Sequence, residues 1–196
     1  MIANPAQEAD LHIHLVSQAQ QGDHDAFSVL MTDRIPKLYR IAGLITGRRD
    51  LAEDAVQDAL MRAWRDLPRL RDVERFDGWL HRLLVNACHD QGRRQRRRRT
   101  EAPLGEQEHS GVSMDPTQAL AQRDELERAF RRLNTKDRAV IVLRHYIGLS
   151  TAEAAAAMGM REGTLKSRLH RAMKLMAAAM AAESRASDIT TKGRTA

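Results

Sequence analysis

The feature that most constrains the fold is a break between two blocks of apolar periodicity. Residues 100–118 carry four acidic residues, two prolines and two glycines, with no lysine or arginine and no apolar repeat. Such a composition is typical of a linker, so the chain is predicted to divide into two blocks around it. We expect an N-terminal extension at 1–20, a first domain at 21–99, the acidic linker at 100–118, a second domain at 119–182 and a disordered tail at 183–196.

Composition indicates that both blocks are helical. Aromatic residues make up 4% of the 196 residues, whereas Ala, Leu, Glu and Arg are abundant, which favours helices over strands. The predicted fold class is therefore all-α, with two small helical domains joined by a flexible linker.

Several protein classes are excluded at this stage. The single cysteine, Cys88, allows neither an internal disulfide nor a zinc site built from several thiolates. The chain has no run of about 18 apolar residues, and its N-terminus lacks the basic start and apolar stretch of a signal peptide. We therefore expect a cytoplasmic protein with no membrane partner. We also expect no metal, no cofactor and no small-molecule substrate.

Positive charge is concentrated in two places. The net charge is +6, but six of the seven residues 93–99 are Arg. A second basic cluster comprises Arg161, Lys166, Arg168, His170, Arg171 and Lys174. Arginine bonds phosphate oxygens bidentately, so both clusters suit a polyanion. The first could instead be a solvated helix end whose cations favour the helix dipole, but the mutual repulsion of six arginines favours the polyanion.

Apolar spacings of three and four predict the helices of the first block. A helix over 25–44 is interrupted or bent near Pro36, a second covers 51–65, and a long one covers 76–99 after a loop at 67–75. The long helix should bury Phe76, Trp79, Leu80, Leu83, Leu84 and Ala87, with Cys88 half-buried beside them, and should turn outward Arg82, Val85, Asn86, His89, Arg93 and Arg96. The outer face of the second helix carries Asp54, Gln57, Asp58, Met61 and Arg65, and is either a solvated surface or a docking surface.

The second block has the pattern of a helix-turn-helix. A helix over 120–133 is followed by Asn134, which is expected to cap a helix that buries Val140, Leu143, Tyr146 and Ile147 and ends at Gly148. Ser150 and Glu153 form a capping box for a short helix over 152–158, and Gly159 makes the turn into a helix over 162–181. The apolar face of that last helix holds Leu165, Leu169, Ala172, Met173 and Met176, and its polar face holds groups able to bond phosphates and base edges.

These motifs resemble a known family. Residues 50–58, followed by Ala63 and Trp64, resemble the core-binding segment of sigma-seventy-family factors, and residues 76–86 with the Arg run resemble their promoter-melting segment. Residues 148–153 and 163–172 resemble their final helix-turn-helix, although Ala154 stands where the family usually has a larger aliphatic residue. With two blocks and a short linker, the chain resembles an extracytoplasmic-function (ECF) sigma factor.

The resemblance implies partners and site residues. The partners are core RNA polymerase, through its two largest subunits, promoter DNA and an anti-sigma factor. Region two would bind polymerase and melt the minus-ten element, with the loop over 70–76 capturing a flipped base, and region four would read the minus-thirty-five element. Core polymerase would bind Asp54, Gln57, Asp58 and Met61; the minus-ten strand would contact Arg82, Asn86, His89, Arg93 and Arg96; and the minus-thirty-five element would contact Arg161, Thr164, Lys166, Ser167, Arg168, His170, Arg171 and Lys174. The acidic linker would mimic nucleic acid in the polymerase cleft.

Two other functions remain as alternatives. A helix-turn-helix repressor or activator would need a dimerisation or ligand domain to read symmetric half-sites, and the first block does not resemble one. An enzyme is disfavoured because the sequence has no paired carboxylates in an apolar setting, phosphate-binding Gly-rich loop, nucleophile elbow or metal-ligand cluster. We therefore expect a protein that is not an enzyme.

Overall fold

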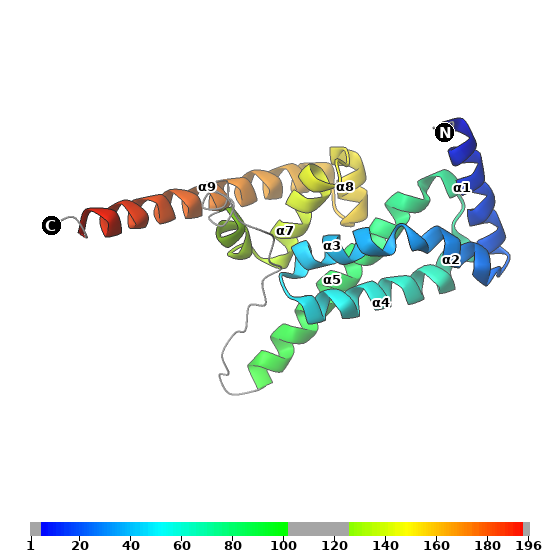
Figure 1. Cartoon of the computed structure of the whole chain (residues 1–196), viewed down its shortest axis with the longest axis horizontal. Coiled ribbons are helices and arrows are strands. Elements are labelled where there is room, and N and C mark those ends of the chain that lie inside the picture. The colour runs from blue at the N-terminus through cyan, green and yellow to red at the C-terminus, as the bar shows by residue number, and fades with distance from the viewer. Residues whose placement is uncertain (1–4, 102–125, 194–196) are drawn as a thin grey trace. The chain divides into compact units, whose positions relative to one another are not determined.

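The computed structural model describes residues 5–101 and 126–193, and these residues form helices and short helical turns with no strand among them. The all-α fold class is confirmed. The chain divides into two compact units, Met1–Gln107 and Glu108–Ala196 (Figure 1). The division falls within the predicted linker, 100–118, of which all but the first two residues lie outside the described ones.

The first unit is a helical bundle. In chain order it contains α1 (Pro5–Gln20), α2 (His24–Thr32), α3 (Ile35–Thr46), α4 (Arg49–Asp66), two 3₁₀ turns (Leu67–Arg69 and Val73–Arg75) and α5 (Phe76–Glu101). Helices α3, α4 and α5 pack against one another, while α1 packs on α2 and on the two 3₁₀ turns. Figure 1 shows α1 lying across one end of the bundle.

Local sequence signals set the ends of these helices. The side chain of Asp23 caps α2 by accepting hydrogen bonds from the backbone N–H groups of Asp25 and Ala26 at 2.9 and 3.0 Å. The interruption predicted near Pro36 is confirmed, since α2 ends at Thr32 and Pro36 lies in the first turn of α3. Helix α3 ends at Gly47, whose φ of +70° is a left-handed conformation that glycine adopts without strain.

Helix α1 is part of the folded unit, although residues 1–20 were predicted to be an extension. Val16 and Ala19 are buried in the bundle, and Gln20 bonds to the segment before α5. Val16 and Ala19, three residues apart, form only a narrow apolar stripe, and polar residues surround it. Such a pattern does not predict a helix that is buried in a bundle.

Helix α5 buries more of its surface than its sequence pattern predicted. Phe76, Leu80, Leu84 and Ala87 are buried as expected, and Trp79 and Leu83 are half-buried. Val85, predicted to face outward, and Cys88, predicted to be half-buried, are both completely buried. The reason is that α5 packs on both α3 and α4, so a wider arc of its surface is covered than one neighbouring helix would cover.

The second unit contains the helix-turn-helix. Of the helix predicted over 120–133, residues 126–133 are described, and the helix among them ends at residue 131. They are followed by α7 (Thr135–Ile141), a π-helical turn (Val142–Tyr146), α8 (Thr151–Ala157) and α9 (Glu162–Gly193). A buried cluster of Leu133, Ile141 and Ala172, with Phe130, Leu169 and Met176 packed on it, joins α7 to α9.

The caps predicted for this unit are confirmed. Asn134 Oδ1 accepts from the N–H of Asp137 at 3.0 Å, and Ser150 and Glu153 form the reciprocal capping box of α8. The prediction that Tyr146 is buried is wrong, because its side chain is 48% exposed. The π-helical turn adds a residue to the hydrogen-bonded ring, so that the N–H of Ile147 bonds to the carbonyl of Val142, and this changes the direction in which later side chains project.

Helix α9 is longer than the sequence suggested. Residues 183–196 were predicted to be a disordered tail, but the helix continues to Gly193, and residues 194–196 lie outside the described ones. The Ala-rich segment 177–182 has high helix propensity, and no Gly or Pro interrupts the chain before Gly193.

Candidate functional site

The four residues predicted to bind polymerase lie together on the outer face of α4. Asp54, Gln57, Asp58 and Met61 line a shallow, open hollow of about 340 Å³, and Gln91 and Arg94 of α5 complete its wall. Met61 is 64% exposed. A large apolar side chain surrounded by exposed polar groups is typical of a docking surface, because it is free to be buried by a partner.

Asp58 differs from the other three because it is already paired. Its carboxylate lies 3.2 Å from Arg62 Nη2 and 3.8 Å from Arg94 Nη1. Arg62 also contacts Asp90 of α5 at 3.0 Å, and Asp90 accepts a 2.5 Å bond from Arg93. Burial would raise the pKa of Asp90, but the hydrogen bonds from Arg62 and Arg93 outweigh it and lower that pKa.

These contacts form a chain of ion pairs from α4 to α5, which we call the α4–α5 ion-pair chain: Asp58, Arg62, Asp90 and Arg93. One end belongs to the predicted polymerase surface and the other to the predicted minus-ten surface. Arg62 and Asp90 were not predicted as part of either surface, since they are 28 residues apart and nothing in the sequence pairs them.

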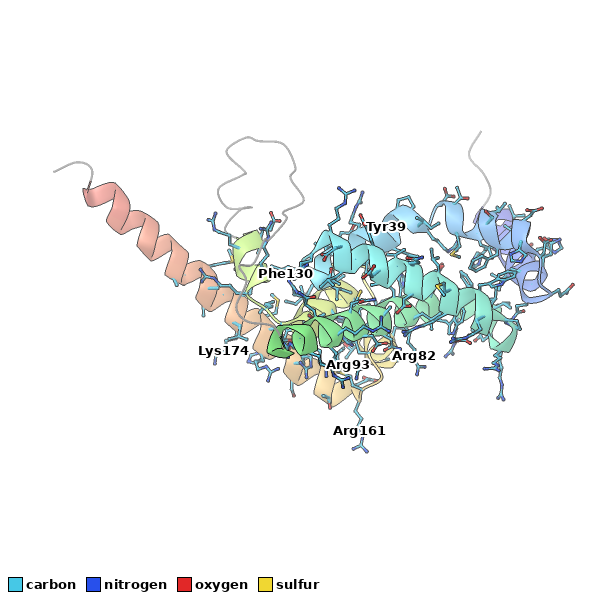
Figure 2. The ribbon with its side chains drawn as sticks, turned by 90° about the horizontal axis from the view of Figure 1, so that it is seen from below. Tyr39, Arg82, Arg93, Phe130, Arg161 and Lys174 are labelled. Atoms are coloured by element: carbon cyan, nitrogen blue, oxygen red, sulfur yellow. The ribbon has the colours of Figure 1, made fainter. Side chains whose placement is uncertain are left out.

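The residues predicted to meet the minus-ten strand lie along α5. Arg82, Asn86, Arg93 and Arg96 are exposed, and His89 is half-buried. Figure 2 shows Arg82 and Arg93 extending from the same side of α5, whereas Tyr39 of α3 lies on the opposite side of the bundle. The exposed members offer guanidinium and amide donors, which suit phosphate oxygens and base edges.

The segment before α5, predicted to hold a flipped base, has a defined conformation. Its exposed side chains are Arg71, Asp72, Glu74 and Arg75, and Phe76 at its end is buried. Asp72 organises the second 3₁₀ turn: its carboxylate accepts from the N–H of Glu74 at 3.2 Å and pairs with Arg75 at 2.9 Å.

The start of the same segment is bonded to α1. Gln20 Nε2 donates to the carbonyl oxygens of Leu70 at 2.7 Å and Leu67 at 3.2 Å. Gln20 was not predicted as a site residue, because its partners are 47 and 50 residues away and it precedes the predicted first domain.

The predicted minus-thirty-five residues lie on α9 and, in the case of Arg161, immediately before it. The exposed members are Arg161, Thr164, Lys166, Ser167, His170, Arg171 and Lys174. Figure 2 shows Arg161 just before the N-terminal end of α9 and Lys174 further along the helix. The hydroxyl of Ser167 donates to the carbonyl of Gly163 at 3.0 Å, so its oxygen still has lone pairs to accept another bond.

Arg168 does not join this exposed group. It is 22% exposed and donates a 2.8 Å bond to Asp137 of α7, whose side chain is 1% exposed. Arg171 reaches the same carboxylate oxygen at 3.4 Å but remains 60% exposed. Asp137 also accepts a 2.6 Å bond from Asn134 Nδ2. A buried carboxylate therefore ties α7 to the helix that carries the basic face.

Within residues 5–101 and 126–193, no three His, Cys, Asp or Glu side chains are grouped so that they could hold a metal ion. None of the helices described there is both long and apolar enough to cross a membrane.

Comparison with known proteins gives two family matches in the order that the motifs predicted. Residues 30–98 match Sigma-70 region 2, and residues 123–176 match Sigma-70, region 4. The ECF RNA polymerase sigma factor SigM of Mycobacterium tuberculosis is 36% identical over 156 residues, which cover 80% of this chain and 78% of the relative. An RNA polymerase sigma-E factor of Streptomyces antibioticus is 36% identical over 154 residues, which cover 78% of this chain and 83% of the relative.

Solved structures agree with these matches. CnrH in complex with the cytosolic domain of CnrY is similar with a TM-score of 0.62 at 28% identity, covering 88% of this chain and 98% of that one. The sigma factor RpoE in complex with the anti-sigma factor NepR from Bartonella quintana has a TM-score of 0.62 at 27% identity, covering 79% of this chain and 96% of that one. Because both sigma-70 regions are present in order and relatives above 30% identity span most of the chain, the protein belongs to the ECF RNA polymerase sigma factors of the sigma-70 family.

Proposed function

We propose that the hollow on α4 is the surface through which this sigma factor docks on the largest subunit of core RNA polymerase. The observation that carries the proposal is that four residues selected from the sequence line one open hollow with an exposed methionine. Met61 would supply apolar contact area, and the carboxylate of the exposed Asp54 would face a basic surface of the polymerase.

The basic face of α5 would then hold the minus-ten element. Arg82 and Asn86 would contact the exposed strand, and Arg93 and Arg96 would bind its phosphates. Melting needs no chemistry from the protein: binding an extruded base in the loop over 70–76 offsets unstacking, which costs a few kcal/mol per base. The exposed polar side chains at 71, 72, 74 and 75 are the groups that this loop offers to such a base.

The second unit would read the minus-thirty-five element with α9 in the major groove. Arg161, Lys166 and Lys174 would bind phosphates, while Thr164, Ser167 and His170 would reach base edges. Arg171 would bind phosphate with the part of its guanidinium that Asp137 leaves exposed. We assign Arg168 a different role, which is to hold α9 on α7 through Asp137.

Further partners follow from family membership. We infer that the second unit binds the second-largest polymerase subunit and that an anti-sigma factor controls this chain, since RpoE, which has 27% identity, was solved with the anti-sigma factor NepR. We also infer that the protein works in the cytoplasm, where bacterial RNA polymerase transcribes, and that it has no catalytic activity of its own.

Run-off transcription tests this proposal directly. Core polymerase is incubated with genomic fragments, with and without the protein, and promoter-specific transcripts are expected only when the protein is present. If no new transcripts appear, the proposed function is wrong.

Charge reversal tests the docking surface. Asp54→Lys should weaken binding to core polymerase by at least about tenfold, because it places like charges together. The matched control is Asp33→Lys, at the exposed C-terminal end of α2 and outside the hollow, which should bind core polymerase as the wild-type protein does. Equal binding by both variants would refute the assignment of the hollow.

A further inference from the structure

The segment that connects α4 to α5 begins with the buried side chain of Leu67 and is also bonded there to a side chain of α1. The carboxamide of Gln20 donates to the carbonyl oxygen of Leu67, the first residue of the first 3₁₀ turn, and to that of Leu70, the residue after the turn. At Leu70 the backbone leaves helical geometry, with φ −69° and ψ 111°. Gln20 therefore fixes the point from which the loop departs.

The end of the segment is held by α1 as well. Phe76 is completely buried, and the ring of His12 packs edge-on against it with 5.7 Å between ring centroids. Arg34 of the α2–α3 connection lies over the same ring, 5.4 Å from its centroid, and pairs with Asp77 at 2.7 Å. Two residues of α1, eight positions apart, thus contact the two ends of one loop.

Between these anchors the loop presents its side chains to solvent. Arg71, Asp72, Glu74 and Arg75 are exposed, and the turn that carries them is organised by Asp72. Fixing a residue's backbone into one conformation costs conformational entropy, so a loop that is ordered before binding spends less of its binding energy on ordering.

We infer that Gln20 is a positioning residue for minus-ten recognition, acting through the loop that it anchors. This inference rests on the proposed function of the loop in capturing an extruded base. Gln20 does not contact the DNA; it holds the backbone at Leu67 and Leu70, so that the loop is already shaped when the base arrives. α1 thereby contributes to promoter recognition, although it lies before the segment that matches region 2, which begins at residue 30.

Two substitutions remove the anchor in different ways. Gln20→Met keeps the length of the side chain and loses both hydrogen bonds, while Gln20→Glu also places a carboxylate against two carbonyl oxygens. The matched control is Gln21→Glu, an exposed neighbour just after α1 that receives the same charge. Trp64 and Trp79 are the two tryptophans of the chain and both lie in the first unit, so their fluorescence during denaturant unfolding reports whether each variant is folded.

The experiment uses the full-length protein, core polymerase and a promoter that the wild-type protein transcribes. The non-template strand of the minus-ten element carries an abasic site at one position at a time. We expect transcription by the wild-type protein and by Q21E to fall sharply when the extruded base is absent. Q20M and Q20E should bind core polymerase within about twofold of wild type, transcribe the intact promoter about tenfold less, as the loss of two hydrogen bonds predicts, and respond little to that abasic site.

Three other outcomes would contradict the inference or the proposed function. If Q20M, folded by its tryptophan fluorescence, shows the same sensitivity to the abasic site as wild type, the inference is overturned. A loss of core binding in step with transcription would show a general structural role and would also overturn it. If the wild-type protein directs no promoter-specific transcription, the proposed function is overturned and the inference with it.

Discussion

The buried carboxylate of Asp137 provides a sharp test of how α9 is held on α7. Asp137→Asn removes the charge and keeps the shape of the side chain. The backbone cap of α7 survives, because it joins the N–H of residue 137 to Asn134 Oδ1. The substitution therefore removes the charge that faces Arg168 and Arg171, at 2.8 and 3.4 Å, and leaves a single acceptor oxygen for these arginines and for the bond from Asn134 Nδ2.

The loss of unfolding free energy expected for D137N depends on how deeply Asp137 and its two arginine partners are buried. Breaking a buried ion pair by removing one partner costs about 3–5 kcal/mol, and exposed pairs are worth about 0–1 kcal/mol. Asp137 is 1% exposed, but Arg168 and Arg171 are 22% and 60% exposed, so water can solvate the released guanidinium groups in part. We expect D137N to lower the free energy of unfolding of the second unit by about 2 kcal/mol.

Hydrogen exchange of the full-length protein measures this loss unit by unit. Amides of α7 and α9 should lose protection in D137N, while tryptophan fluorescence, which reports the first unit, should show an unchanged unfolding midpoint. The control is Glu127→Gln, which breaks the ion pair with Arg131 at the surface of the same unit and should cost at most about 0.5 kcal/mol. The reasoning fails if D137N and E127Q lose equal protection, or if the first unit is destabilised as well.

Three further predictions concern the other surfaces. Met61→Ala should weaken core-polymerase binding by about tenfold in a binding titration and change the free energy of urea unfolding by no more than about 0.5 kcal/mol. The control is Val29→Ala, at another exposed apolar side chain, and equal binding by the two variants would contradict the prediction. Lys174→Ala should reduce the slope of log K against log salt for promoter DNA by about 0.9, whereas Lys136→Ala on α7 should leave it unchanged. Burial, and then Arg34, lower the pKa of His12, and burial lowers that of His81 despite the opposing effect of Asp77. The unfolded chain therefore binds more protons than the folded chain as the pH falls through about 6.5, the pKa of an unperturbed histidine. The stability of the first unit should be highest well above that pH and should fall as the pH is lowered through it; a constant tryptophan-detected midpoint would refute this.

Local signals in the sequence predicted much of the fold. The caps at Asn134 and Ser150 act over three residues, and the buried stripe of α5 follows helical spacing, so both can be read without knowing the tertiary structure. Tyr146 could not be placed, because its orientation depends on a π-helical turn for which the sequence has no known local signal.

Contacts between residues far apart in the chain could not be predicted from the sequence. The face of α4 was predicted because its residues share one helix face, but Gln91 and Arg94 of the same hollow belong to α5. Arg168 was grouped with its exposed neighbours by position, whereas its partner Asp137 lies 31 residues earlier. Which side of α9 faces α7 depends on packing, which helical spacing alone does not specify.

The burial of α1 changes where this protein can be shortened. A chain that begins at residue 21, where the first domain was predicted to start, would lose the buried side chains of Val16 and Ala19. A chain that begins at residue 30, where the region 2 match starts, would also lose the first turns of α2. Burial of a valine side chain alone is worth about 1.5–3 kcal/mol, a large share of the stability of a small domain. A fragment intended for biochemistry or crystallisation therefore has to keep the part of α1 that carries Val16 and Ala19, and limited proteolysis of the intact protein should spare the peptide bonds around these residues.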